Sequence, residues 1–111
     1  MDLGRLEEAF EDDTVGIADL LDMALETGAK HRRALEEGIA AGDADVVRRA
    51  AHSIKGSAGN IGADEVMRLA SELDERARAG DLSDARARVD AIDAAYAQVA
   101  EEVRAYRASL A

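Results

Sequence analysis

Apolar residues in this chain recur at alternating spacings of three and four, and no proline occurs anywhere in the sequence. Such spacing places apolar side chains on one face of an α-helix. The clearest example spans residues 85–110 and consists of Ala85, Val89, Ile92, Tyr96, Val99, Val103, Tyr106 and Leu110. No segment alternates apolar and polar residues over the length of a strand. We therefore predict an all-α fold.

Two shorter helices are predicted before this one, over residues 44–61 and 63–79. Gly42 and Asp43 precede the first of them and form a pair typical of a helix end followed by the N-cap of the next helix. The second carries acidic residues in its first turn, where negative charge stabilises the helix dipole.

Other glycine and polar residues predict further helix ends. Gly80 is expected to end a helix, and Asp81 or Ser83 is expected to cap the N-terminus of the last one. The segment 14–41 has helical spacing throughout, but Gly28 lies inside it. We predict a kink, or a break between two helices, at this glycine.

The predicted helices are joined by connections of only a few residues, so neighbouring helices are expected to run antiparallel. A short first helix near Leu3, Leu6 and Phe10 is expected to pack across one end. The predicted architecture is an up-down-up-down four-helix bundle with an extra N-terminal helix. A length of 111 residues suits a single domain over residues 1–111.

Composition excludes several classes of protein. The chain has 14 basic and 24 acidic residues, a net charge of −10, which disfavours binding to nucleic acid. It contains no cysteine, so disulfide scaffolds and thiolate metal sites are excluded. No apolar run is long enough for a membrane span, and the N-terminus does not resemble a signal peptide. We expect a cytoplasmic protein that binds neither nucleic acid nor membranes.

His52 is the candidate for chemistry on the helix 44–61. At 100° per residue it falls on the polar side, about 160° from the apolar stripe. Arg48, Arg49 and Lys55 lie three or four residues away along the same helix. A neutral imidazole is a nucleophile near pH 7, because its unperturbed pKa is about 6.5. A phosphoryl group on this ring would meet nearby cations, and Lys55 in particular could balance its charge.

Gly56 and Gly59 follow His52 on this helix, in a sequence that uses alanine freely elsewhere. Glycine inside a helix costs about 0.5–1 kcal/mol relative to alanine, so these residues are not there for helix stability. They lower the surface so that another protein can reach the imidazole, or they thin the helix for close packing against a neighbour. Periodicity alone leaves both readings open.

The segment 51–62, with the sequence AHSIKGSAGNIG, resembles the signature of histidine-containing phosphotransfer (HPt) domains. The shared pattern is H-x-x-K-G, followed by a small residue one turn later and then by an apolar residue and glycine. The similarity extends over essentially the whole chain. It implies a phosphorelay module in which His52 accepts a phosphoryl group and exchanges it with receiver-domain aspartates.

The resemblance also implies roles for neighbouring residues. Lys55 matches the family lysine that pairs with the phosphate, and Gly56 matches the glycine that leaves room for the partner. Members of the family place a polar side chain on the following helix to hydrogen-bond the ring. That position is Asp74 here, where many members have glutamine or glutamate, and Ser71 and Glu75 are alternative candidates.

Partners and cofactors follow from the same resemblance. The expected partners are response-regulator receiver domains and a histidine kinase or hybrid kinase, and Arg48 and Arg49 could dock against the acidic pocket of a receiver. No cofactor is expected on this chain, and Mg²⁺ is expected in the receiver. The sequence has no phosphate-binding glycine loop of a nucleotide-binding enzyme, so we expect a relay intermediate without ATP-dependent kinase activity. We also expect the protein to be a monomer.

Three alternatives stay open. The chain could be the N-terminal phosphoacceptor domain of a chemotaxis-type histidine kinase. It could be a helical adaptor that binds a receiver or kinase without carrying phosphate, or a structural or oligomerisation bundle, although that last reading leaves Gly56 and Gly59 unexplained.

The remaining polar candidates are read as structural. His31 lies in a basic run without flanking glycines and is interpreted as a solvated side chain. The acidic segment 11–13 is interpreted as a helix cap and a solvated loop. No spacing typical of a histidine metal site occurs, so no metal site is expected.

Overall fold

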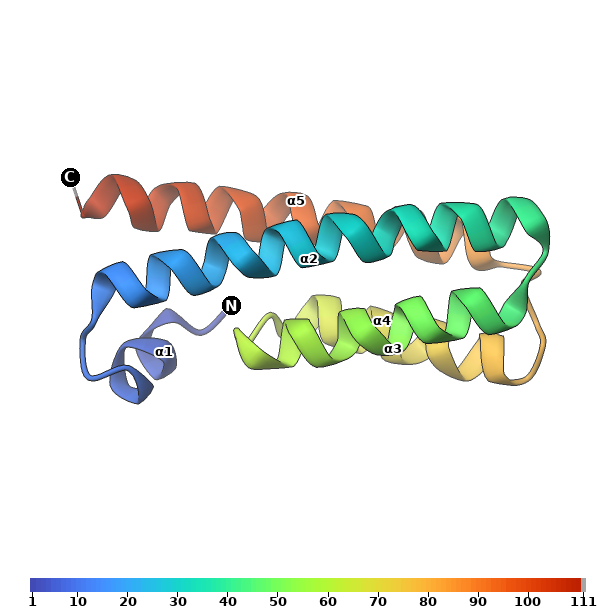
Figure 1. Ribbon diagram of the computed structural model, residues 1–111, viewed down its shortest axis with the longest axis horizontal. Coiled ribbons are helices and arrows are strands. Elements are labelled where there is room, and N and C mark those ends of the chain that lie inside the picture. The colour runs from blue at the N-terminus through green and yellow to red at the C-terminus, as the bar shows by residue number, and fades with distance from the viewer. Residues whose placement is uncertain (111) are drawn as a thin grey trace.

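The computed structural model describes residues 1–110, and within them the chain forms five α-helices and no strand. The helices are α1 (Leu3–Ala9), α2 (Thr14–Ala41), α3 (Ala44–Asn60), α4 (Asp64–Arg78) and α5 (Ala85–Ser109). Figure 1 shows the four long helices lying along one another, with α1 below one end of α2. The prediction of an all-α fold with a short N-terminal helix is confirmed. In residues 1–110 no helix is long and apolar enough to cross a membrane.

The four long helices enclose one core. Helix α2 packs against α3 and α5, and α4 packs against the same two helices. The core is mainly aliphatic, as expected for a chain with three aromatic residues. Its largest fully buried side chains are Ile17, Leu21, Leu35, Ile54, Ile61, Leu73, Ile92, Val47, Val66 and Val89. Leu110 follows the end of α5 and is exposed, so the predicted stripe of that helix ends at Tyr106.

The connection between α2 and α3 forms as the sequence predicts. Gly42 ends α2 with a left-handed φ of 64°, a conformation that suits glycine. The Asp43 carboxylate then accepts hydrogen bonds from the backbone N–H groups of Asp45 and Val46 at the start of α3. Each residue satisfies backbone groups that a helix end would otherwise leave unpaired.

The N-terminus of α5 differs from the prediction. Its N-cap is Asp84, whose side chain makes no capping hydrogen bond, and neither Asp81 nor Ser83 takes that place. The Asp81 carboxylate instead accepts hydrogen bonds from the backbone N–H and the hydroxyl of Ser83. Asp81 therefore stabilises the turn before the helix, because its side chain reaches the backbone two residues ahead.

Gly28 does not break α2, so the predicted break between two helices at this residue is wrong. The helix runs without a break from Thr14 to Ala41. A Cβ atom at Gly28 would lie 2.5 Å from a ring carbon of Tyr96 on α5. The glycine is there to admit the tyrosine ring, a reason that local sequence does not reveal.

Candidate functional site

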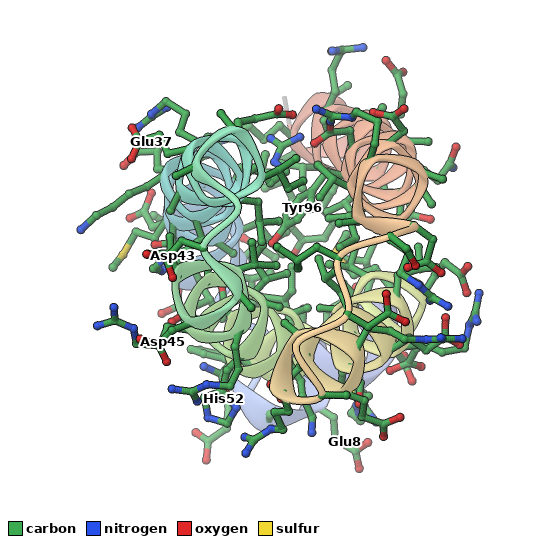
Figure 2. The ribbon with its side chains drawn as sticks, turned by 90° about the vertical axis from the view of Figure 1, so that its right-hand side faces the viewer. Glu8, Glu37, Asp43, Asp45, His52 and Tyr96 are labelled. Atoms are coloured by element: carbon green, nitrogen blue, oxygen red, sulfur yellow. The ribbon has the colours of Figure 1, made fainter. Side chains whose placement is uncertain are left out.

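His52 lies on the outer surface of α3. Five residues of this helix are buried on the opposite side, whereas the His52 side chain is 63% exposed. Figure 2, a view along the bundle, shows His52 at the periphery and Tyr96 near the centre. The imidazole is therefore anchored on a rigid, well-packed helix and remains accessible to another protein.

Helix α4 places Asp74 behind the imidazole. Asp74 is buried, with 5% of its surface exposed, and its Oδ2 lies 3.6 Å from Nδ1 of His52. Its other oxygen, Oδ1, accepts a hydrogen bond of 3.0 Å from Nε of Arg78. Among residues 1–110 no hydrogen bond joins the ring to Ser71, to Glu75 or to any other side chain, and the 3.6 Å contact with Asp74 is itself longer than a hydrogen bond. The side chain of Asp74 is thus long enough to bring its carboxylate against the ring.

The cations beside His52 fall into two groups. Arg48 and Arg49 both reach the Asp45 carboxylate, each through a contact of 3.0 Å. Lys55 is partly buried, and in the part of the chain that the structure describes no carboxylate lies within 4.0 Å of its ammonium group. An anion arriving at His52 would therefore compete with Asp45 for the two arginines but not for Lys55.

The two glycines after His52 have different surroundings. A Cβ atom at Gly56 would meet nothing within 4 Å, so the surface there is open. A Cβ atom at Gly59 would lie 3.4 Å from Sδ of Met67 on α4. Close packing thus gives no reason for glycine at position 56, and at position 59 an alanine would make only an ordinary contact with the flexible Met67 side chain. The open surface beside Gly56 agrees with the first of the two readings of the sequence.

The other polar candidates lie away from this ring. The prediction that His31 is simply solvated is only partly right, because it is half-buried in a groove between α2 and α3. Burial, with a smaller contribution from the charge of Lys30, lowers the pKa of His31 below its usual value of 6.5. Asp13 caps α2 through the Gly16 N–H, in agreement with the structural reading of the acidic segment 11–13. Within residues 1–110, no three potential ligands are grouped for a metal ion.

A family model described as the Hpt domain matches residues 19–102. This chain belongs to the Hpt domain family. This chain is also similar to the crystal structure of histidine-containing phosphotransfer protein B (HptB) from Pseudomonas aeruginosa PAO1, with 33% sequence identity and a TM-score of 0.88. The match covers 96% of this chain and 90% of that chain. No curated protein matches the sequence.

The comparisons confirm the resemblance drawn from the segment 51–62 at the level of the family and its class of activity. Hpt domains are histidine phosphotransfer modules of phosphorelays, and they are not kinases. The five-helix arrangement described above is that of an Hpt fold.

Sequence reasoning missed Arg78. It lies four residues after Asp74 on α4, a spacing that places two side chains together on one helix face. That spacing was available in the sequence, but it became informative only once Asp74 was known to be buried.

Proposed function

We propose that His52 is the phosphoacceptor of this Hpt domain and exchanges a phosphoryl group with the aspartate of a receiver domain. One observation carries the proposal: an exposed imidazole has its Nδ1 turned toward the buried carboxylate of Asp74, 3.6 Å away. A carboxylate accepts an N–H, so it favours the ring tautomer with hydrogen on Nδ1. The lone pair then lies on Nε2, where an incoming phosphoryl group can reach it.

The transfer needs little from this chain besides position and charge. Nε2 attacks the phosphorus of the aspartyl phosphate, the N–P bond forms, and the bond from phosphorus to the aspartate oxygen breaks. The carboxylate that leaves stays in the receiver, together with the Mg²⁺ expected there. Lys55 balances the charge of the phosphoryl group on the ring, since no carboxylate in residues 1–110 engages it.

Access and docking involve the same face of α3. The open surface at Gly56, and the low surface at Gly59, let the active-site pocket of a receiver approach the ring. Arg48 and Arg49 contribute positive charge to this face of an otherwise acidic protein. Opposite charge on the receiver would speed the encounter.

The proposal includes the arrangement of the whole chain. The proposed domain comprises residues 1–111, and the helices of residues 1–110 run as an antiparallel up-down-up-down bundle with α1 added, an order that the short connections between packed helices support. The domain acts as a monomer, receives its phosphoryl group from a histidine or hybrid kinase pathway through a receiver, and uses no ATP itself. It is a relay intermediate that carries no resident cofactor.

The test uses a panel of receiver domains that are first phosphorylated by a small phosphodonor with Mg²⁺. Each is incubated with the wild-type chain, with His52→Gln and with His31→Gln as the matched control. We expect one acid-labile phosphate, detected by intact mass, on the wild type and on His31→Gln but not on His52→Gln. Circular dichroism would check that both variants remain helical.

Two results would contradict the proposal. Full labelling of His52→Gln would show that another residue accepts the phosphate. Binding of a receiver with equal affinity to wild type and His52→Gln, without labelling by any receiver, would favour a helical adaptor.

A further inference from the structure

Asp74 is the one buried charged side chain among residues 1–110. Transfer of a carboxylate from water into a protein interior is costly unless the charge is paired and hydrogen-bonded. The exposed imidazole beside Asp74 cannot provide a permanent positive charge, because a nucleophilic ring must be neutral. The carboxylate therefore needs another partner, one with a permanent positive charge.

Arg78 is that partner. Its Nε donates a hydrogen bond of 3.0 Å to Oδ1 of Asp74, and in residues 1–110 no other lysine or arginine lies within 4.0 Å of this carboxylate. The contact occupies only one of the two oxygens. Oδ2 is left facing Nδ1 of His52 at 3.6 Å. The guanidinium thus supplies charge and also fixes which oxygen faces the ring.

We propose that Arg78 is a positioning residue for His52, because it holds the Asp74 carboxylate turned so that Oδ2 faces Nδ1 of the ring. This inference rests on the proposed function. Arg78 acts through Asp74 and holds the ring in the tautomer whose Nε2 carries the lone pair.

Loss of the guanidinium would release the Asp74 carboxylate from this orientation. Oδ2 would no longer be held against Nδ1, and the ring would lose the acceptor that favours hydrogen on this nitrogen. The ring hydrogen would move to Nε2, which could no longer attack phosphorus. The ring would then be a poor phosphoacceptor, just as a histidine in the wrong tautomer is a poor base in serine proteases.

The experiment compares Arg78→Met with Arg76→Met. Arg76 lies on the same helix, is similarly exposed, and pairs with Asp81 in the turn rather than with Asp74. Long-range ¹H–¹⁵N spectra of ¹⁵N-histidine protein would report the tautomer of His52, with His31→Gln used to assign the signals. Labelling by potassium phosphoramidate, which needs no partner protein, would report the reactivity of the ring.

We expect the His52 ring to be mainly Nδ1–H in the wild type and in Arg76→Met, and mainly Nε2–H in Arg78→Met. Labelling of Arg78→Met should slow about tenfold or more, whereas Arg76→Met should be labelled like the wild type. If Arg78→Met does not fold, Arg78→Gln removes the same charge more conservatively and should show the same tautomer change.

An unchanged tautomer in the folded Arg78 variants would overturn the inference, as would an equal change in Arg76→Met. These results are distinct from failure of the proposed function. If the tautomer changes in Arg78→Met but neither a receiver nor phosphoramidate labels the wild-type chain, the role of Arg78 would be supported and phosphotransfer at His52 refuted.

Discussion

Two glycines in helix interiors, Gly28 in α2 and Gly56 in α3, have opposite surroundings. A Cβ atom at Gly28 would lie within 2.5–2.7 Å of three atoms of the Tyr96 side chain, whereas one at Gly56 would meet nothing within 4 Å. Both residues forgo the helical stability of alanine. The first does so to admit a core side chain and the second to keep a surface low, so the same residue type serves packing in one helix and access in the other.

The surroundings of Tyr96 explain why the packing at Gly28 is demanding. The ring is buried, and the Arg32 guanidinium lies 4.4 Å from its centroid on the side of α2. Arg32 is itself held by an ion pair of 3.4 Å with Asp93 on α5. The ring therefore has little freedom to move away from a new methyl group.

The largest effect on stability is expected for Gly28→Ala. The added methyl group overlaps the Tyr96 ring, and overpacking of this kind costs about 1–3 kcal/mol, more than the helix gains from alanine. Urea unfolding followed by circular dichroism would measure the loss. Labelling of His52 should persist in the folded variant. A Gly28→Ala variant more stable than the wild type would show that glycine is not needed there to admit the Tyr96 ring.

On the surface of α3 around Gly56, Lys55→Met should slow phosphoryl transfer from a receiver about tenfold, equivalent to about 1.4 kcal/mol. The reason is the loss of a charged hydrogen-bonding partner of the phosphate. The control is Lys30→Met, which removes an exposed lysine charge from α2 rather than from the face of α3 that carries His52. Single-turnover transfer rates would separate the two. Equal slowing of both variants would mean that net charge, rather than the position of Lys55, matters.

Gly56→Ala tests directly whether glycine at this position gives a receiver access to His52. We expect the free energy of unfolding to rise by about 0.5–1 kcal/mol, because alanine is the better helix former and its methyl group meets no neighbour. Transfer from a receiver should slow, whereas labelling by phosphoramidate should not change. A variant that is more stable and accepts phosphate from receivers at the wild-type rate would exclude a role of Gly56 in access.

Tyr96→Phe tests the same packing contact from the side of α5. The Tyr96 hydroxyl is buried and has no hydrogen-bond partner in the described part of the chain. Its removal should change stability by about 1 kcal/mol or less, in the stabilising direction. In the Gly28→Ala background the gain should be larger, because the hydroxyl oxygen is one of the three atoms that the new methyl group meets. A double-mutant cycle would measure this coupling.

The smallest effect concerns His31, in the groove between α2 and α3. Since folding lowers the pKa of His31 below 6.5, the unfolded chain binds this proton more tightly. The stabilising contribution is fully present above about pH 6.5 and is lost as the pH falls through the lower pKa of the folded state. Unfolding measured between about pH 5 and 7.5 should show this slope in wild type and a reduced slope in His31→Gln.

Features that depend on neighbours along the chain were predictable from the sequence. The helical spacing, the Gly42 and Asp43 pair and the phase of His52 on its helix all depend on residues within one or two turns. The segment 51–62 belongs to the same class, since its residues share one helix and the turn after it. These local features were enough to establish the fold class and the resemblance to the Hpt family.

The sequence thus determined the helices, most of their ends and the side of α3 on which His52 lies, because helical geometry converts spacing directly into direction. Only the tertiary structure decided that Tyr96 occupies the space beside Gly28, that Asp74 is buried against the ring, and that Arg78 engages it. These depend on how closely α2 approaches α5 and α3 approaches α4. Such distances are set by the packing of the whole core and leave no periodic trace in any one helix.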